Sequence, residues 1–380
     1  MKVLILATWY PDSLNPVSGI FVKEQVRALV DVGINPIVYY PYDKSVDKGK
    51  CIKVIENGVI TYRANTDYFK ITKLSRLYSI IKGTKILKKI VKENGIDLIH
   101  SHVCYTGGFI AWLYNKFYKI PYIITEHSSK VKEFASKIYN RPLFSLSYKN
   151  AQCVVTVSSY LAKELTNLNF KFKSKVIGNV VDTSIYKLNS NNNSKNKEFN
   201  ILFVGLMVQS EVKGLQYFIP ALADFIKNNP EYKINLHLVG DGPKREKYEN
   251  MCKELNIEDN CKFYGRVEKE LIPEFIEKND FLVLPSVKET FGSVLIEAMS
   301  GGKPVLATKC GGPNEFVENN VGVLVEPKNI EALEDGLKTI IERYEEFHSN
   351  YIREYADNNF SYRAIGGKLK ELYEEVLSEH

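Results

Sequence analysis

Two glutamates eight residues apart form the pattern with the clearest chemical meaning in the sequence. Glu289 and Glu297 flank Phe291-Gly292, and a helix is predicted to begin directly afterwards, at Ser293. Glu297 would lie about one turn inside that helix, so both carboxylates can lie near its N-terminus. A carboxylate in this position is stabilised by the helix dipole and can accept hydrogen bonds from sugar hydroxyls. Either glutamate alone would be interpreted as a helix-end charge or a solvated side chain.

Glycine-bearing loops occur at four places where a predicted strand ends and a predicted helix begins. They cover residues 15–19, 205–214, 240–243 and 290–292. Glycine lets the main chain approach a ligand, and a helix N-terminus offers free N–H groups and a positive dipole end. One such loop is an ordinary tight connection. Four of them, in both halves of the chain, favour a diphosphate held in a cleft between two domains.

One lysine and three histidines could take part in the same chemistry. Lys213-Gly214 precedes a predicted helix, where a lysine can meet a phosphate as a point charge. His127 follows a predicted strand, at the edge where α/β proteins bind ligands. His100 and His102 alternate along another strand, and we expect them in the core or on the floor of the cleft. No acidic partner with metal-ligand spacing accompanies them, so no metal site is predicted.

Short apolar runs alternate with stretches of helical spacing along most of the chain. Continuous apolar strands that alternate with helices indicate a parallel sheet covered on both faces. The sequence therefore predicts a doubly wound α/β fold. The predicted strands are Val3–Ala7, Leu98–His102, Tyr122–Thr125, Val154–Val157, Ile201–Val204, Ile234–Val239, Phe281–Leu284 and Val305–Ala307.

The alternation is interrupted once, by a polar, Asn-rich segment at residues 188–200. Such a segment cannot pack into a core. We therefore expect two Rossmann-like domains, residues 1–184 and 185–360, with a cleft between them. A last helix, at roughly residues 362–377, is expected after a polar turn at residues 357–359.

The composition excludes several classes of protein. In 380 residues, 44% are apolar and 25% charged, which is enough apolar content to fill a core. The 51 basic and 45 acidic residues give a net charge of +6, too weak an excess to indicate a nucleic-acid partner. The six cysteines include no Cys-x-x-Cys pair, which favours reduced thiols in the cytoplasm. No apolar run approaches the roughly 18 residues that span a bilayer.

The segment Lys70–Lys92 is basic throughout, with eight lysine or arginine residues and no acidic one. Lys82, Lys85, Lys89 and Lys92 recur at helical spacing. The face is either a solvated helix surface or a contact with anionic lipid, which contributes about 1 kcal/mol per basic residue. Aromatic residues are not interleaved as a nucleic-acid stacking surface requires.

A nicotinamide-binding site is the main alternative to a bound sugar nucleotide. Gly240-Asp241-Gly242 follows a predicted strand and precedes a helix, as a dinucleotide fingerprint does. However, Arg245 occupies the place of the third glycine, and the motif lies in the second half of the chain. A Walker A loop is excluded because Gly302-Lys303 is followed by Pro304.

Taken together, these segments resemble the GT-B glycosyltransferases, specifically the retaining glycosyltransferase family 4, over nearly the whole chain. The most specific stretch runs from Glu289 to Val305 and resembles the family's Glu-x7-Glu motif with its Ala-Met and Gly-x-Pro-Val continuation. The other matching segments are Gly19-Ile20-Phe21, Thr125-Glu126-His127, Gly178-Asn179-Val180-Val181-Asp182, Val204-Gly205, Lys213-Gly214, Val239-Gly240-Asp241-Gly242-Pro243 and Gly311-Gly312-Pro313-Asn314-Glu315.

The resemblance implies three catalytic residues. Glu289 would hold the donor sugar, His127 would contact that sugar from the N-terminal half, and Lys213 would neutralise the diphosphate leaving group. The family needs no catalytic metal, and the chain has no Asp-x-Asp triplet to bind one. No cofactor is implied, since the nucleotide-diphosphate sugar is a substrate. The final helix, residues 361–380, would return to the N-terminal, acceptor-side domain.

The resemblance also implies a set of donor-binding residues on several loops. Glu297 would hold the ribose hydroxyls, and the Gly265-Arg266-Val267 loop would line the base. The full set is Gly19, Gly205, Lys213, Gly265, Arg266, Val267, Glu289, Phe291, Gly292, Ser293 and Glu297.

One residue departs from the family pattern. The family commonly has an arginine soon after the glycine that matches Gly205, paired with the lysine of Lys-Gly. Here Leu206 occupies that place, and the loop to Lys213 looks extended. The bidentate phosphate contact of an arginine is therefore missing or supplied from elsewhere.

The expected activity is transfer of a hexosyl unit, with retention of configuration, from a nucleotide-diphosphate sugar to a glycan or lipid-linked acceptor. A UDP-sugar is preferred to a GDP-sugar, and the setting would be bacterial-type cell-surface polysaccharide synthesis. The enzyme would work in the cytoplasm, peripherally on the inner membrane face if Lys70–Lys92 contacts lipid. Two alternatives stay open: an NAD-dependent oxidoreductase, and a catalytically silent sugar-binding homologue, which Leu206 makes conceivable.

Overall fold

The computed structural model describes residues 1–66, 72–188 and 197–380, without the side chains of residues 72–76. Its contacts divide the chain into two compact units. The first unit consists of Met1–Val180 together with Tyr362–His380, and the second of Val181–Ser361. The sequence predicts the boundary between residues 184 and 185, four residues further along the chain.

The first unit is built on an eight-stranded sheet with the order β3-β4-β2-β1-β5-β6-β7-β8. Every pairing is parallel except that of β3 with β4. Because β1 pairs with both β2 and β5, the chain order reverses at β1, and the loops after β1 and β5 diverge at a ligand-binding edge. The strands are β1 (Lys2–Ala7), β2 (Asn35–Tyr40), β3 (Cys51–Glu56), β4 (Val59–Ala64), β5 (Leu98–His102), β6 (Tyr122–Glu126), β7 (Val154–Thr156) and β8 (Ser174–Val176).

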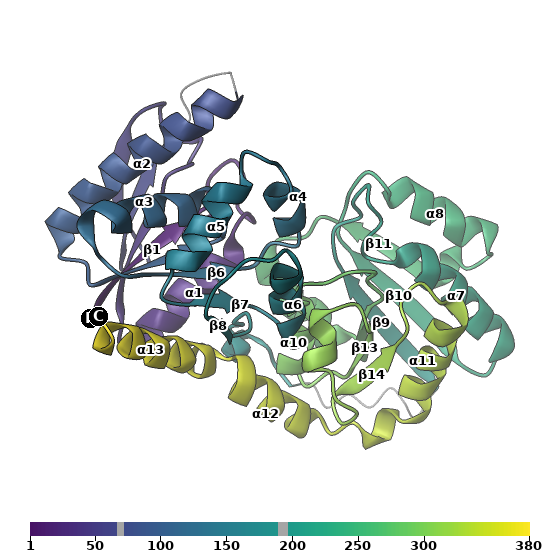
Figure 1. Ribbon diagram of the computed structural model, residues 1–380. Helices are drawn as coiled ribbons and strands as arrows, with labels where there is room; N and C mark the ends of the chain where they lie inside the picture. The colour runs from purple at the N-terminus through teal and green to yellow at the C-terminus, as the bar shows by residue number, and fades with distance from the viewer. Residues whose placement is uncertain (67–71, 189–196) are drawn as a thin grey trace. The chain divides into compact units, whose positions relative to one another are not determined.

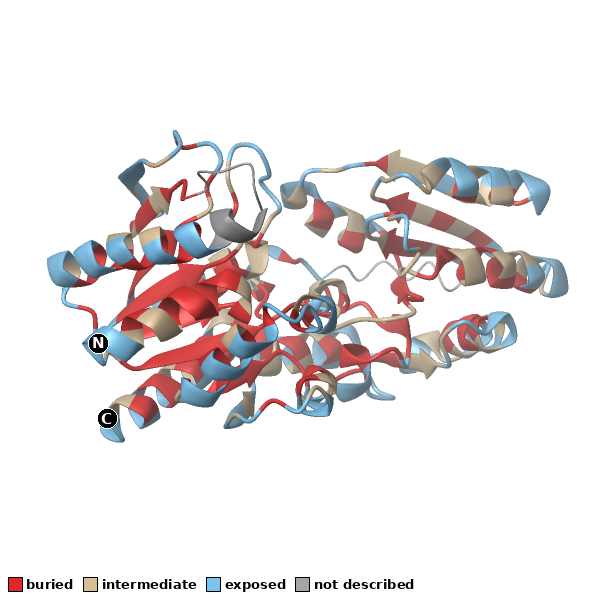
Figure 2. Ribbon diagram, turned by 45° about the horizontal axis from the view of Figure 1, so that its top comes forward, coloured by how far each residue is buried: buried red, intermediate tan, exposed pale blue. Residues whose placement is uncertain are grey.

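Helices cover both faces of this sheet, because alternate residues of its buried strands point to opposite sides. Val3 and Ile5 of β1 pack with apolar residues of α1 and α13, whereas Leu4 and Leu6 pack with those of α2, α3 and α5. The central strands of the sheet are therefore buried on both sides, as Figure 2 shows by colour. The helices are α1 (Ile20–Asp31), α2 (Thr72–Asn94), α3 (Phe109–Tyr118), α4 (Val131–Ala135), α5 (Arg141–Asn150), α6 (Ser159–Asn167) and α13 (Tyr362–Ser378) (Figure 1).

The second unit contains a six-stranded parallel sheet with the order β11-β10-β9-β12-β13-β14. The order reverses at β9, so the loops after β9 and β12 flank the switch point. The strands are β9 (Glu198–Val204), β10 (Lys233–Val239), β11 (Cys261–Gly265), β12 (Phe281–Leu284), β13 (Val305–Thr308) and β14 (Gly322–Val325). The helices are α7 (Leu215–Asn228), α8 (Arg245–Glu254), α9 (Ile272–Lys278), α10 (Ser293–Ser300), α11 (Ile330–Glu342) and α12 (Ser349–Phe360).

The prediction of two Rossmann-like α/β domains is confirmed. Every strand predicted from an apolar run is present, and α10 begins at Ser293 as predicted. The polar turn predicted at residues 357–359 is wrong, because these residues continue α12 to Phe360. The Asp357 carboxylate is satisfied there by the Thr183 hydroxyl, and the Asn359 amide donates back to the Tyr355 carbonyl.

The predicted basic segment is helical where the structure describes it, as α2. Lys70 lies outside the described residues, and Lys73 and Arg76 are among the omitted side chains. Across residues 1–66, 72–188 and 197–380, no helix is long and apolar enough to cross a membrane.

Candidate active site

The N-terminus of α10 lies at the carboxyl edge of the second unit's sheet, beside the switch point. Glu289 is held next to it by main-chain bonds to the loop after β13. Its N–H donates to the Cys310 carbonyl (3.1 Å), and its carbonyl accepts from the Gly312 N–H (3.0 Å). Gly292 has a left-handed backbone (φ 94°), and Ser293 is the first residue of α10. A backbone turn thus presents the free N–H groups of a helix beside a carboxylate.

Phe291 holds this loop in place by packing its side chain against other aromatic rings. Its side chain is buried, and its ring lies 5.1 Å from that of Phe316 and 5.9 Å from that of Phe360. The main chain of this loop, rather than the phenyl ring, is therefore what a ligand could contact. Glu297 is half-buried and lies one turn inside α10, in the place that its spacing predicts.

Lys213 and Glu289 are brought together from two different loops. Lys213 Nζ lies 2.5 Å from Glu289 Oε1, and Ser286 Oγ donates to the same oxygen at 2.8 Å. Both side chains are partly accessible, with 26% and 13% of their surface exposed. A partly hydrated ion pair can exchange partners, so Lys213 is available to an incoming anion while Glu289 accepts other donors. Ser286 belongs to this cluster although the sequence analysis does not single it out.

Gly214 explains how Lys213 reaches Glu289. Its backbone is left-handed (φ 76°), and a Cβ atom there would lie 1.8 Å from the Pro285 carbonyl oxygen. Only glycine lets the loop before α7 pass this close to the chain that leaves β12. Val287 N–H also donates to the Val212 carbonyl at 2.8 Å, which ties the two loops together.

The other predicted donor-binding residues of the second unit lie at the same edge of its sheet. Gly205 follows β9, and its N–H donates to the Val239 carbonyl at 2.9 Å. Leu206 is 59% exposed, so the side chain at the place where an arginine is common in the family is apolar and solvent-exposed. Gly265 ends β11, which β10 separates from β9. Arg266 and Val267 follow it, and Arg266 is exposed there.

In the first unit, the structure places His127 beside the loop that contains Gly19. The Phe21 ring lies 4.3 Å from the His127 ring. Gly19 is left-handed (φ 64°), and a Cβ atom there would lie 2.2 Å from the Trp9 carbonyl oxygen, so this turn requires glycine. His127 Nδ1 lies 3.0 Å from Asn179 Oδ1. Phe21 and Asn179 both belong to segments that match the family, which is the signal that could have identified them.

All three histidines of this unit's sheet edge are buried, as expected for His100 and His102. His102 Nδ1 lies 3.1 Å from His127 Nε2, and His100 contacts Tyr373 Oη and Thr125 Oγ1. Burial lowers the pKa of His100 and of His127 to about 3, and that of His102 well below its usual value. The cluster is therefore neutral at physiological pH.

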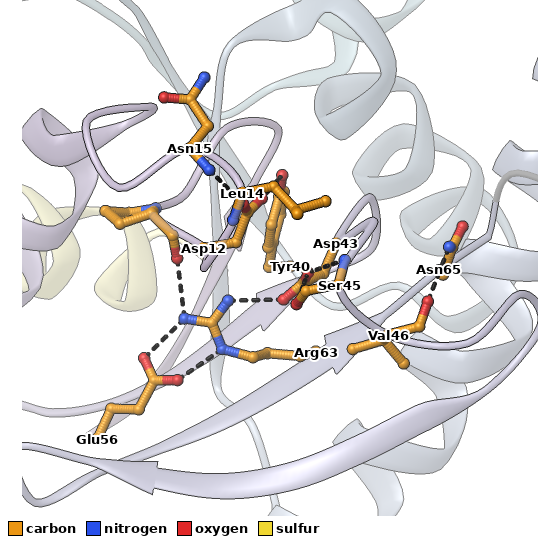
Figure 3. Close-up of polar contacts among 11 residues, drawn as sticks. Asp12, Leu14, Asn15, Tyr40, Asp43, Ser45, Val46, Glu56, Arg63 and Asn65 are labelled. Atoms are coloured by element: carbon orange, nitrogen blue, oxygen red, sulfur yellow. Dashed lines mark hydrogen bonds and ion pairs between the residues drawn. The ribbon is translucent and has the colours of Figure 1, made fainter.

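The loop that leads to Gly19 is fixed at its start by Arg63 of β4 (Figure 3). The Arg63 guanidinium donates to the Pro11 carbonyl at 2.9 Å, to Asp43 Oδ2 at 2.7 Å and to Glu56 Oε1 at 2.5 Å. The guanidinium is only 13% exposed and Asp43 is fully buried. Because bidentate arginine–carboxylate bonds set geometry as well as charge, this network holds the loop in one place.

Glu126 fixes the neighbouring loop, which follows β5. Its carboxylate accepts from the Cys104 N–H (3.0 Å), the Ser128 N–H (3.2 Å) and the Tyr148 hydroxyl (2.9 Å). Burial raises the pKa of Glu126 although these bonds oppose the shift. Val103 in that loop has φ 71°, which is strained for a β-branched residue. Such strain persists only where surrounding contacts enforce it, and here Glu126 supplies them.

Among the residues that the structure describes, no group of three or more histidine, cysteine, aspartate or glutamate side chains is placed to hold a metal ion.

The two units match two family models. Residues 18–185 match the model "Glycosyltransferase Family 4", and residues 185–358 match "Glycosyl transferases group 1". An uncharacterized glycosyltransferase of Methanocaldococcus jannaschii, MJ1178, is 31% identical over 348 residues, which cover 91% of this chain and 90% of the relative.

Solved structures of two glycosyltransferases share the fold. Sucrose-phosphate synthase from Thermosynechococcus elongatus superimposes with a TM-score of 0.78 at 21% identity and covers 100% of both chains. Anabaena HepE in complex with UDP-glucose has a TM-score of 0.74 at 20% identity, over 99% of this chain and 100% of that one. Together with the matched family models, these similarities show that the chain belongs to the family 4 glycosyltransferases, with a GT-B fold.

Proposed function

We propose that this glycosyltransferase moves a hexosyl unit from a nucleotide-diphosphate sugar to a glycan or lipid-linked acceptor, with retention of configuration, in cell-surface polysaccharide synthesis. The observation that carries the proposal is the pairing of Lys213 with Glu289 at the N-terminus of α10. A cation, a carboxylate and free helix N–H groups at one point match the diphosphate and the hydroxyls of a sugar nucleotide.

In this proposal each residue of the cluster has a distinct task. Lys213 leaves Glu289 for the diphosphate and balances the negative charge that grows there as the glycosidic bond breaks. Glu289 then accepts hydrogen bonds from the donor sugar, while Ser286 keeps its carboxylate oriented. Glu297 holds the ribose hydroxyls, and His127 contacts the sugar from the first unit. A UDP-sugar is preferred, in line with the UDP-glucose complex of the Anabaena relative.

A thermal-shift screen tests the proposal directly. The protein is heated with UDP, GDP, ADP, their common hexose conjugates and NADH, each at the same concentration. A cognate ligand at one hundred times its dissociation constant stabilises the protein by about 2.7 kcal/mol. A shift with a nucleotide sugar, followed by release of the nucleotide diphosphate, supports the enzyme. Binding without release indicates the catalytically silent homologue. NADH serves as the negative control, because the chain belongs to a glycosyltransferase family.

Replacing Glu297 by alanine is expected to weaken nucleotide-diphosphate binding. Losing a charged acceptor should cost about 1.5–3 kcal/mol of binding free energy. Isothermal titration with UDP measures the change. Glu274→Ala is a control for the loss of one helical glutamate elsewhere in the second unit, since Glu274 lies in the first turn of α9 and is exposed. An unchanged dissociation constant in the Glu297 variant would remove this residue from the ribose site.

We also propose that α2 contacts anionic membrane, where a lipid-linked acceptor would be presented. Its lysines Lys85, Lys88, Lys89 and Lys92 are exposed, and Lys82 is half-buried. On the same helix Leu77, Tyr78 and Ile81 are exposed apolar side chains. Basic side chains beside apolar ones suit the interface between headgroups and acyl chains.

Vesicle sedimentation at low and high salt tests this contact. We expect reversible binding to anionic vesicles, none to neutral ones, and loss at high salt because charges are screened over about 8 Å at physiological ionic strength. Reversing Lys82, Lys85, Lys89 and Lys92 to glutamate should abolish binding and leave UDP affinity intact.

A control with the same net charge separates the helix from the overall charge of the protein. It carries glutamate at four exposed lysines of the second unit, Lys227, Lys253, Lys262 and Lys278. If both variants lose vesicle binding equally, the attraction is unspecific. If the unaltered protein pellets negligibly with vesicles, and equally so at low and at high salt, the membrane proposal is wrong.

A further inference from the structure

His127 is the end of a stack of buried rings in the first unit. The rings of His100 and His102 lie 4.3 Å apart, and those of His102 and His127 5.4 Å apart with planes inclined by 16°. The Phe21 ring of α1 also contacts His127, with 4.3 Å between the ring centroids. His102 is 1% exposed and His127 7%. The proposed function gives a task to His127 alone, so the role of His102 is open.

The hydrogen bonds of this stack determine where the protons lie. Asn179 Oδ1 can only accept, so His127 Nδ1, at 3.0 Å, must carry a proton. A neutral imidazole then has a bare nitrogen at Nε2, and the atom facing it, His102 Nδ1 at 3.1 Å, must be the donor. The chain of donation therefore runs from His102 through His127 to Asn179. The reverse chain would require Asn179 to present its amide nitrogen.

His102 Nε2 agrees with this order. Once Nδ1 carries the proton, Nε2 of a neutral ring is a bare acceptor. That atom is buried and has no hydrogen-bond partner among the described residues. Because burial disfavours the charged ring, His102 stays neutral and keeps its single proton on the side of His127. His100 differs, since both of its partners are hydroxyls that can donate or accept.

We propose that His102 is a positioning residue, which holds His127 as a neutral ring protonated at Nδ1 by filling its Nε2 with an N–H donor. The inference rests on the proposed role of His127 at the donor sugar. With Nε2 filled, the one N–H of the His127 ring is the Nδ1–H that Asn179 Oδ1 accepts, so a sugar hydroxyl that binds this ring must act as an acceptor and share or replace Asn179. Without His102, the Asn179 amide could turn to present its nitrogen to Nδ1, which would admit the other tautomer, and the ring could turn away from the sugar.

The unaltered protein provides the first test, since it needs no ligand and no substitution. In protein labelled with ¹⁵N-histidine, the six imidazoles give six sets of ring signals, and His127→Gln identifies the set from His127. We expect protonated Nδ1 and bare Nε2 for both His127 and His102 at neutral pH. A His127 ring protonated at Nε2, at both nitrogens, or mixed between tautomers would overturn the inference.

Two variants of His102 separate positioning from packing. His102→Asn keeps an N–H donor near the place of Nδ1, whereas His102→Leu keeps the bulk and removes the donor. We expect a mixture of His127 tautomers in the leucine variant and a single tautomer in the asparagine variant. If the leucine variant does not fold, the unaltered protein and His102→Asn still decide the matter.

Kinetics with the nucleotide sugar selected by the thermal-shift screen complete the test. His102→Leu should lower kcat/KM about tenfold or more, as misplaced groups near the reacting sugar do. The dissociation constant of UDP should stay within about twofold, since UDP lacks the transferred hexose that would meet His127. His102→Asn should restore most of the loss. Equal losses in both variants would show that His102 only fills space. If the unaltered protein binds no nucleotide at all, the proposed function fails, whatever the His127 tautomer.

Discussion

Replacing Lys213 by alanine is expected to reduce turnover far more than donor affinity. Negative charge on the departing diphosphate grows as the glycosidic bond breaks, so a counter-charge acts most strongly in the transition state. Loss of one such stabilising group typically costs about 10²–10³ in kcat, or roughly 2.7–4 kcal/mol. We expect a fall in this range, with a smaller rise in the donor dissociation constant.

Leu206 is the reason for expecting the upper part of that range. In relatives with an arginine at this place, two cations would share the charge of the leaving group. Here the side chain is an exposed leucine, and Lys213 is the cation that the structure places beside Glu289 at the N-terminus of α10. Removing Lys213 also leaves the Glu289 carboxylate with the Ser286 hydroxyl and no counter-charge at that oxygen, which further disfavours an approaching phosphate.

A matched lysine in the same unit controls for a general loss of charge. Lys309 follows β13 at the same edge of the sheet, and its Nζ lies 2.8 Å from Glu326 Oε1. Lys309→Ala therefore breaks a lysine–glutamate ion pair away from α10, one that is more exposed than the pair of Lys213 with Glu289. Steady-state and single-turnover assays with both variants give kcat and the donor dissociation constant separately. A Lys213 variant within about threefold of the unaltered turnover, under roughly 1 kcal/mol of barrier, would mark Lys213 as an ordinary surface lysine.

The second unit's site follows largely from local sequence. Glu289, Gly292 and Glu297 lie within one loop and one helix, so their spacing determines which of them face the helix N-terminus. The close pairing of Lys213 with Glu289 is different, since it joins residues 76 positions apart. It depends on Gly214 passing Pro285, a contact that no periodicity reveals. The resemblance to a family suggested both residues, but only the fold shows them as one ion pair.

The first unit's site is less predictable, because it is assembled from distant segments. His127 is recognisable at the end of a strand, but its partner Asn179 lies 52 residues away. The alternation of His100 and His102 places them on one face of β5 and leaves their hydrogen-bond partners unknown. These partners decide which ring nitrogen carries a proton, and they come from β6, α13 and the segment after β8.

Two elements show where apolar patterns fail. The hairpin of β3 and β4 is not predicted, because β3 is mostly exposed and has no continuous apolar run. Its turn, Asn57-Gly58, is a common hairpin signal and could have indicated it. Residues 357–359 look like a turn by composition, yet tertiary contacts of α12 override their weak helix propensity.

Lowering the pH from 7 to 5 is expected to destabilise the first unit strongly. In the folded state, burial lowers the pKa of His100 and of His127 to about 3 and that of His102 well below its usual value. An unfolded histidine has a pKa near 6.5. The unfolded chain therefore binds more protons than the folded one throughout this interval. The stability from these neutral rings is complete above pH 6.5 and is lost as the pH falls towards 3.

The size of the effect follows from proton linkage. Each histidine costs about 1.4 kcal/mol per pH unit below 6.5, or roughly 2 kcal/mol between pH 7 and pH 5. Glu126 acts in the opposite direction, because burial raises its folded pKa and the folded state then gains a proton first. Asp43 has a lowered pKa and titrates below this interval, because burial raises its pKa by less than the hydrogen bonds from Ser45 and Arg63 lower it. The three rings together should lower the unfolding free energy by roughly 6 kcal/mol, and Glu126 offsets part of this loss.

Tryptophan fluorescence isolates this effect, because Trp9 and Trp112, the two tryptophans of the chain, both belong to the first unit. Urea unfolding followed at their emission, at half-unit steps from pH 7 to pH 5, gives the stability of that unit alone. His102→Asn removes one of the three titrating rings and keeps its donor, so its pH slope should fall by about one third. Two results would contradict this prediction: an unaltered protein that keeps its stability at pH 5, or an asparagine variant that keeps the full pH slope. Either would show that the histidine stack is not neutral and buried in solution. The proton order inferred for His102 and His127 would then be wrong as well.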